Sequence, residues 1–252
     1  MHSADELRAL VEDALGELAL HRDIGPLEDA VRYGFEGGKR IRPVLCLAVG
    51  EALGRDPEEL LPAACALELV HSFSLVHDDL PALDDDDTRR GRPSTWAQFD
   101  EASAVLAGDA LLVEAFRLAA TYETTALVRE LAEATLGMIG GQHLDVAGAA
   151  PDLASLNRLK TGRLFESAVA CAVAVADVEP QTWPVFGREV GALFQLVDDL
   201  LDGDGFVLVQ GQEETRRRAD EAAERALSAL AELDADTSVL RGLVEGLATR
   251  TV

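Results

Sequence analysis

Two groups of aspartates, each at the end of a long apolar segment, restrict the fold of this chain more than any other feature. The first is LVHDDLPALDDDD, where six aspartates lie within ten residues after the apolar stretch LELVHSFS, and the second is FQLVDDLLD, near residue 200. Carboxylates oppose the dipole at the C-terminal end of a helix, and neighbouring carboxylates repel one another. Both groups are explained if their helices face each other across one cavity that holds positive charge. The alternative is two solvated stripes at helix ends.

Signals for helix starts recur along the whole chain, whereas the alternation expected of strands is almost absent. Ser3 and Glu6 match a capping box, and Asp56 followed by a proline predicts the start of a long helix that reaches about Asp79. Another helix is expected within 37–53, after a glycine pair. Further helices are predicted at 101–122, 124–146, 152–176, 181–202, 212–233 and 237–249, separated by short Gly, Pro or Asp breaks.

The composition agrees with a helical fold and with a single folding unit. Ala and Leu dominate the 48% apolar share, and β-branched runs are short, which favours helices over strands. The chain has no internal repeat, no low-complexity linker and no shift in composition that marks a domain boundary. We therefore predict an all-α fold, a single-domain helical bundle over residues 1–252.

The charge and the apolar pattern exclude several classes of protein. Forty-six acidic residues against 22 basic ones give a net charge of −24, which argues against nucleic-acid binding. Three widely spaced cysteines in apolar segments indicate buried thiols in a reducing compartment. The N-terminal sequence is no signal peptide, and the run AVACAVAVA is too short to cross a bilayer. We therefore expect a cytoplasmic protein without a membrane span.

The spacing of the second acidic group points to a hard metal ion. On a helix, Gln195, Asp198, Asp199 and Asp202 fall at spacings of three and four and share one face. Carboxylates without accompanying His or Cys suit Mg²⁺, which keeps several waters and takes other ligands from substrate phosphates. The acidic groups therefore suggest Mg²⁺ together with a phosphorylated ligand.

The lysines indicate where such a ligand would bind. Only two lysines occur beside 20 arginines: Lys39 in GGKRIRP and Lys160 in RLKTGRLF. Arg42 follows Lys39 by three residues, so the two form a cationic edge on one helix face. His71 lies seven residues before Asp78, about 10 Å lower on the same helix face. His71 is then placed to contact a second ligand, and the alternative is a hydrogen-bonded core histidine. We assign no functional role to His2, His21 and His143.

Several motifs in one order resemble a known family. GGKRIRP, ELVHSFSLVHDDLPALDDDDTRRGRPST, LAGDALL, GGQHLD, LKTG and FQLVDDLLD, within roughly 34–205, resemble the trans-isoprenyl diphosphate synthases of the polyprenyl synthetase family. The resemblance implies an all-α bundle around a deep central cavity, usually in a homodimer. It implies a prenyltransferase that uses Mg²⁺, with Mn²⁺ as a substitute. Such an enzyme condenses isopentenyl diphosphate with an allylic diphosphate (dimethylallyl, geranyl or farnesyl).

The resemblance also implies a role for each matching residue. The first metal site would use Asp78, Asp79 and Asp84, and the second Asp198, Asp199 and Asp202. The allylic diphosphate would contact Arg89, Lys160 and Gln195, with Thr161 beside the reacting carbon. Isopentenyl diphosphate would contact Lys39, Arg42, His71 and Arg90. Asp85, Asp86 and Asp87 are interpreted as a solvated flank.

The length of the product is expected to depend on Phe73 and its neighbour Ser74. Phe73 precedes Asp78 by five residues, so it lies about 7–8 Å deeper along the helix. A large ring at that depth would stop a growing chain after few isoprene units, whereas the small Ser74 would not. An aromatic residue here resembles the short-chain, farnesyl-type bacterial enzymes, so we expect a C15 product, with C20 second. The alternative is that Phe73 only fills the core.

One segment departs from the family pattern, and three other functions remain to be weighed. Many relatives carry further lysines after the second motif, but GDGFVLVQGQEETRRR has none. Arg216, Arg217 or Arg218 could compensate, and the alternative is that they form an ordinary charged helix start. A non-catalytic regulatory subunit of a heteromeric synthase would be expected to have lost some of these motifs. A terpene cyclase would need no isopentenyl diphosphate pocket, and a purely structural bundle would not need the two isolated lysines.

Overall fold

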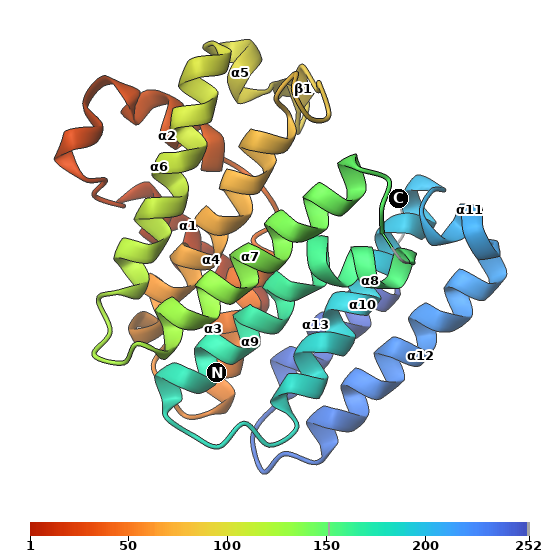
Figure 1. The fold of residues 1–252 in the computed structure, drawn as a ribbon. Helices are drawn as coiled ribbons and strands as arrows, with labels where there is room; N and C mark the ends of the chain where they lie inside the picture. Colours follow the sequence, from red (N-terminus) through yellow and green to blue (C-terminus); the bar gives the residue numbers. More distant parts are fainter. Residues whose placement is uncertain (151, 251–252) are drawn as a thin grey trace.

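Helices make up nearly all the regular structure of residues 1–150 and 152–250, which the computed structural model describes (Figure 1). The prediction of an all-α fold is confirmed. The elements are α1 (Ala4–Gly16), η1 (Arg22–Leu27), α2 (Glu28–Phe35), α3 (Ile41–Ala52), α4 (Pro57–Asp78), β1 (Thr88–Arg89), β2 (Arg92–Pro93), α5 (Thr95–Gln98), α6 (Glu101–Ala119), α7 (Ala126–Val146), α8 (Leu153–Asn157), η2 (Arg158–Gly162), α9 (Arg163–Ala176), α10 (Trp183–Asp202), α11 (Phe206–Gln210), α12 (Gln212–Ala231) and α13 (Ser238–Ala248).

The predicted helix starts are confirmed where capping signals are strong. The Ser3 side chain accepts a hydrogen bond from the backbone of Glu6, and the Glu6 carboxylate accepts one from the backbone of Ser3. The Asp56 carboxylate caps α4, with proline as the first helical residue. The predicted helix 152–176 is interrupted by η2, a single π-helical turn. Such turns are rare and often lie at functional sites.

Sequence analysis did not predict the short elements η1, α2, α5 and α11, nor the hairpin of β1 and β2. The two strands pair antiparallel, with Arg89 opposite Arg92. Arg90 and Gly91 form the turn, and both have positive φ angles, as a tight hairpin turn of this length requires. Arginine is uncommon in that conformation, so RRGR gives little turn signal.

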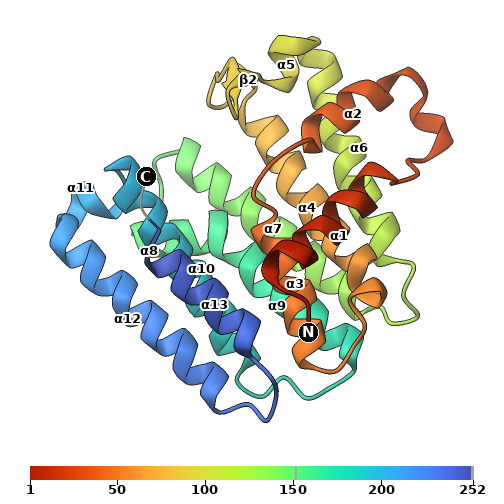
Figure 2. The same ribbon diagram turned by 180° about the vertical axis from the view of Figure 1, so that it is seen from behind.

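The core is centred on α4. This helix packs against α3, α6 and α9, and α10 packs against α9 and α12. In Figure 1, α7, α9, α10 and α12 lie in this order on the side that faces the viewer. Figure 2 shows α1, α3 and α13 on the opposite side. Among the described helices, α4 alone is long and apolar enough to cross a membrane, but 67% of its apolar window is buried in the molecule. That burial is the pattern of a core helix.

Helices α4 and α10 carry the two acidic groups to the same end of the bundle. Both end on the upper side in Figure 1, where the hairpin also lies. The prediction of a single domain over 1–252 remains a prediction, and it includes residues 151 and 251–252, which lie outside the described residues.

Candidate functional site

A cavity of about 580 Å³ lies between α3, α4, η2 and α10. It brings together residues that sequence analysis had taken from four separate motifs. The predicted site residues in its wall are Lys39, Arg42, His71, Arg89, Arg90, Thr161, Gln195 and Asp198. Both proposed diphosphate sites therefore have members in one space, which we call the central cavity.

A second, more apolar cavity of about 300 Å³ lies between α4 and α7. We call it the side cavity. Its wall contains the predicted residues Phe73, Ser74, Asp78 and Lys160, together with Met138, Ile139, Gln142, His143 and others from α7. Lys160 lines the side cavity and the next residue, Thr161, lines the central cavity. The π-helical turn η2 thus contributes to both. His143, to which sequence analysis gave no role, lines the side cavity because α7 turns that face toward α4.

The aspartates of the first acidic group differ in burial and in their hydrogen-bond partners. Asp78 ends α4 and is half-buried, and this burial raises the pKa of its carboxyl to about 6 although Lys160 opposes the shift. Asp79 is buried, and both Nε and Nη2 of Arg89 donate to it, Nε at 2.9 Å. Asp84 is exposed in the following loop, where its backbone nitrogen donates to the carbonyl of Asp78 at 2.9 Å.

The aspartates of the second acidic group differ in the same way. Asp199 is buried and accepts a hydrogen bond from Gln195 Nε2 at 2.6 Å and another from the backbone nitrogen of Phe206 at 2.7 Å. Gly205, with φ of 48°, permits this contact, because a side chain there would collide with the Asp199 carboxylate. Asp198 is only half-buried and accepts a hydrogen bond from Arg250 Nη1 at 3.5 Å. Asp202 is exposed.

These contacts bear on the prediction of three aspartate ligands in each motif. Within residues 1–150 and 152–250, no cluster of three His, Cys, Asp or Glu side chains is arranged to hold a metal ion by itself. Asp79 and Asp199 instead bind neighbouring protein groups. Among the described residues, Asp78 and Asp84 of the first group and Asp202 of the second accept no such hydrogen bond, and Asp198 forms a weak ion pair with Arg250. This donor set fits Mg²⁺, which binds through one or two carboxylates and completes its shell with water and phosphate oxygens.

The basic wall of the central cavity is built from α3, α4 and the hairpin. Arg42 stacks over Phe165, with 4.6 Å from its guanidinium carbon to the ring centroid, and burial lowers the pKa of Arg42 to about 10. Burial, followed by the charges of Arg42 and Arg90, holds the pKa of His71 well below its usual value. His71 is therefore neutral at neutral pH, while Arg42 remains a cation. Because His71 lines the central cavity, the structure places it in the cavity wall and not in the closed core.

Arg90 is held against the turn before α3. Its Nη1 donates to the carbonyls of Glu36 and Gly37, at 3.0 and 2.7 Å. Its guanidinium lies against Gly38, where a side-chain carbon would come within 3.0 Å of Nη2. The glycine pair of GGKRIRP therefore lets Arg90 pack beside Lys39.

Two partners of η2 were missed by sequence analysis. Lys160 Nζ donates to Asp145 at 2.6 Å, so this lysine is tied to α7. Gly141 allows α7 to come this close, because a side-chain carbon at Gly141 would lie 2.8 Å from the backbone nitrogen of Lys160. Both residues belong to GGQHLD, so the glycine pair in that motif was the available signal.

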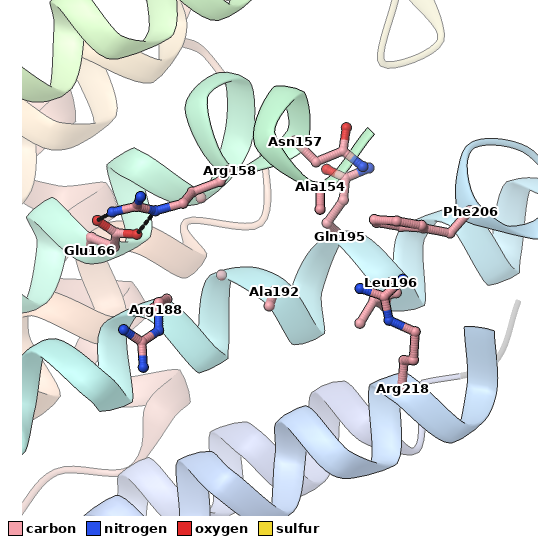
Figure 3. Close-up of a pocket in the computed structure, with 12 residues that line it drawn as sticks. Ala154, Asn157, Arg158, Glu166, Arg188, Ala192, Gln195, Leu196, Phe206 and Arg218 are labelled. Atoms are coloured by element: carbon pink, nitrogen blue, oxygen red, sulfur yellow. Dashed lines mark hydrogen bonds and ion pairs between the residues drawn. The ribbon is translucent and has the colours of Figure 1, made fainter. Parts of the chain in front are cut away.

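The expectation that Arg216, Arg217 or Arg218 replaces the missing lysines gains no support from their contacts. Arg216 donates to the Ala248 carbonyl, and Arg217 pairs with Glu214 and Glu221. Arg218 stacks on Phe206 and lines a third cavity, of about 180 Å³, along α10 (Figure 3). Gln195 lines both this cavity and the central one, and the Arg158–Glu166 ion pair lies at its other end.

Known proteins resemble the chain over most of its length. A family model for polyprenyl synthetases matches residues 25–220. The geranylgeranyl diphosphate synthase of Cyanophora paradoxa is 39% identical over 216 residues, which cover 78% of this chain and 72% of that enzyme. The farnesyl diphosphate synthase of Geobacillus stearothermophilus is 39% identical over 222 residues, covering 80% and 74%.

Solved structures give the same result. The geranyltransferase of Legionella pneumophila superposes with a TM-score of 0.88 at 30% identity, over 98% of this chain and 96% of that chain. The farnesyl/geranylfarnesyl diphosphate synthase of Zymomonas mobilis has a TM-score of 0.86 at 30% identity, over 98% and 100%. With the family model, the related sequences and the fold in agreement, the chain belongs to the polyprenyl synthetase family and is a prenyltransferase.

Proposed function

We propose that this prenyltransferase condenses isopentenyl diphosphate head to tail with an allylic diphosphate, requires Mg²⁺ (or Mn²⁺ in its place), and releases a short product. One observation carries the proposal: the basic wall and Asp198 of the second acidic group line the central cavity, and Asp78 of the first group and Lys160 line the adjoining, more apolar side cavity. Two anionic headgroups and one apolar chain can be accommodated by this arrangement.

The cations divide into two sets that suit two diphosphates. Lys39, Arg42 and Arg90, with neutral His71, would bind isopentenyl diphosphate on the α3 side of the central cavity. Arg89, Lys160 and Gln195 would bind the allylic diphosphate on the side of the acidic groups, with Thr161 at the reacting carbon. Arg89 and Lys160 are paired with Asp79 and Asp145 here, so each would exchange or share that carboxylate with the diphosphate.

The proposed reaction needs no acid or base side chain. The C–O bond of the allylic diphosphate breaks, and its electron pair leaves with the diphosphate, which the cationic side chains stabilise. The double bond of isopentenyl diphosphate attacks the allylic cation, and a proton then passes from the new chain to the released diphosphate. Bound Mg²⁺ would add positive charge beside the leaving diphosphate, held by Asp78 and Asp84 and by Asp198 and Asp202. The helical walls keep water from the cation.

The side cavity is the proposed space for the growing chain. Phe73 and Ser74 lie in its wall, and the Phe73 ring is buried edge-on against the His77 ring, with 5.7 Å between centroids. A ring held in this way would stop elongation early, which supports farnesyl diphosphate (C15) as the product and geranylgeranyl diphosphate (C20) as the second candidate.

A homodimer is proposed from the outer face of α6 and α7. Large apolar side chains are exposed there, among them Leu106, Val113 (66% exposed), Leu136 (69% exposed) and Ile139. Monomeric proteins rarely expose extended apolar patches, which usually mark interaction sites. A second copy of the chain would cover this face, and the cytoplasm is the proposed location of the dimer.

Incubation of the purified chain with Mg²⁺, isopentenyl diphosphate and each allylic diphosphate in turn tests the proposal. We expect elongated products in the mass spectrum, mainly C15, and their loss on chelation of the metal. Asp78→Ala should lower kcat by several orders of magnitude and leave the helical circular dichroism unchanged. Absence of elongation with dimethylallyl, geranyl and farnesyl diphosphate, in a protein that remains folded, would favour the regulatory-subunit alternative.

A further inference from the structure

The turn before α3 adopts a backbone conformation that needs support. Gly37 and Gly38 have φ angles of 73° and 117°, and Arg40, which immediately precedes α3, has φ of 51°. Glycine adopts such angles freely, but a residue with a side chain does so at a cost. Some other interaction must therefore hold Arg40 in this conformation.

The Arg40 side chain provides that interaction from inside the protein. Its guanidinium is buried, with 3% of the residue exposed. Nη1 donates to Glu68 on α4 at 2.5 Å, Nε to Glu12 on α1 at 2.9 Å, and Nη2 to the Phe35 carbonyl at 2.8 Å. One side chain thus ties the turn to α1, to the end of α2 and to α4.

The same ion pair lies in the wall of the central cavity, next to its basic residues. Glu68 is 2% exposed, and Arg40 and Glu68 both line the cavity. Lys39 precedes Arg40 in the chain, and Arg42 is the second residue of α3 after it. Arg90 reaches the turn from the hairpin and donates to two of its carbonyls. Three cations of the proposed isopentenyl diphosphate pocket therefore depend on the path of this turn.

We propose that Arg40 and Glu68 are positioning residues for isopentenyl diphosphate. They would hold Lys39, Arg42 and Arg90 in the binding arrangement before the substrate arrives, so that binding does not have to order the turn. The inference rests on the proposed function. The competing explanation is that this buried ion pair only contributes to folding stability.

A double substitution, Arg40→Met with Glu68→Met, separates the two explanations. It removes one positive and one negative charge, so the net charge of the cavity wall is unchanged. Replacing a buried ion pair by apolar residues often preserves stability, whereas Arg40→Met alone leaves Glu68 buried without its partner. We therefore expect a large loss of Tm in the single variant and recovery of most of it in the double variant. The KM for isopentenyl diphosphate should nevertheless stay raised at least about tenfold, a loss the size of one charge-assisted contact.

The other kinetic constants and a control pair complete the test. The KM for geranyl diphosphate should change by less than threefold in the double variant, because that substrate uses the other set of cations. Arg55→Met with Glu59→Met removes an exposed ion pair at the opposite end of α4 and should leave both KM values unchanged. If the double Met variant does not fold, Arg40→Gln with Glu68→Gln makes the same charge-neutral change with polar side chains.

A folded double variant with wild-type KM for isopentenyl diphosphate would overturn the positioning role. Equal increases of both KM values would overturn it as well, since they indicate a general loss of structure. Failure of the wild-type protein to elongate any allylic diphosphate is a separate result, and it counts against the proposed function itself.

Discussion

Replacing Asp199 by asparagine should destabilise the metal-free protein, although Asp199 lies in a motif of carboxylates that repel one another. Its two oxygens accept hydrogen bonds from Gln195 Nε2 and from the backbone nitrogen of Phe206, at 2.6 and 2.7 Å. Asparagine has one oxygen, so its NH2 group would meet one of these two donors. A buried donor left without a partner costs about 1–3 kcal/mol.

Asp198→Asn in the same motif is the matched comparison. Asp198 is half-buried, and among the described residues its side chain has one hydrogen-bond partner, Arg250 at 3.5 Å. The substitution removes repulsion from Asp199 and Asp202 and a weak ion pair, so the free energy of unfolding should change by less than about 0.5 kcal/mol. For a chain of this size, 1 kcal/mol shifts Tm by roughly 2–4 °C. We therefore expect Asp199→Asn to lower Tm by about 2–12 °C and Asp198→Asn to leave it nearly unchanged.

The assay is thermal unfolding followed by circular dichroism in the presence of a chelator, so that metal binding does not contribute. Activity with Mg²⁺ is then measured for both variants, and Asp198→Asn should show the greater dependence on metal concentration. Equal Tm values for Asp199→Asn and the wild type would refute the anchoring role. The carboxylate would then have to be free for other partners in solution.

Three further predictions concern substrate binding, product length and salt. Lys39→Ala should raise the KM for isopentenyl diphosphate about 10- to 150-fold, and Lys160→Ala should chiefly impair the allylic substrate; reversed phenotypes would exchange the two pockets. Phe73→Ala should shift products from C15 to C20 and longer in mass spectra, and an unchanged spectrum would mean that another residue limits the chain. Because the net charge is −24, screening by NaCl should raise Tm in a salt titration, whereas a falling Tm would show that ion pairs dominate.

Much of the fold could be predicted because local signals and tertiary structure agree. Ser3 with Glu6 and Asp56 with its following proline mark helix starts that the structure shows. The short α2 was missed because eight residues give little periodic pattern. The hairpin was missed because its turn places Arg90 at a positive φ. The contacts of Arg90 with Glu36 and Gly37, which lie 54 and 53 residues earlier in the chain, support that conformation.

The assembly of the candidate site could be predicted only at the level of motifs. Both acidic groups and both lysines contribute to the two adjoining cavities. The positions of the acidic groups at helix ends and the rarity of lysine in the chain were the signals in the sequence. The partners of individual side chains could not be predicted, because they come from distant segments. Asp145 on α7 binds Lys160, and Arg250 near the C-terminus approaches Asp198. Neither pair shares a motif, and each depends on how the helices pack.

The different roles of adjacent aspartates follow from helix geometry. Consecutive residues on an α-helix point about 100° apart, since a turn contains about 3.6 residues. When Asp198 faces the central cavity, Asp199 must face a neighbouring segment, and there it finds Gln195 and the start of α11. At the end of α4, Asp78 likewise faces the side cavity while Asp79 turns to Arg89. In each of these two pairs, therefore, one carboxylate lines a cavity and the other forms hydrogen bonds with neighbouring protein groups. The second carboxylate fixes the helix end from which the first one acts.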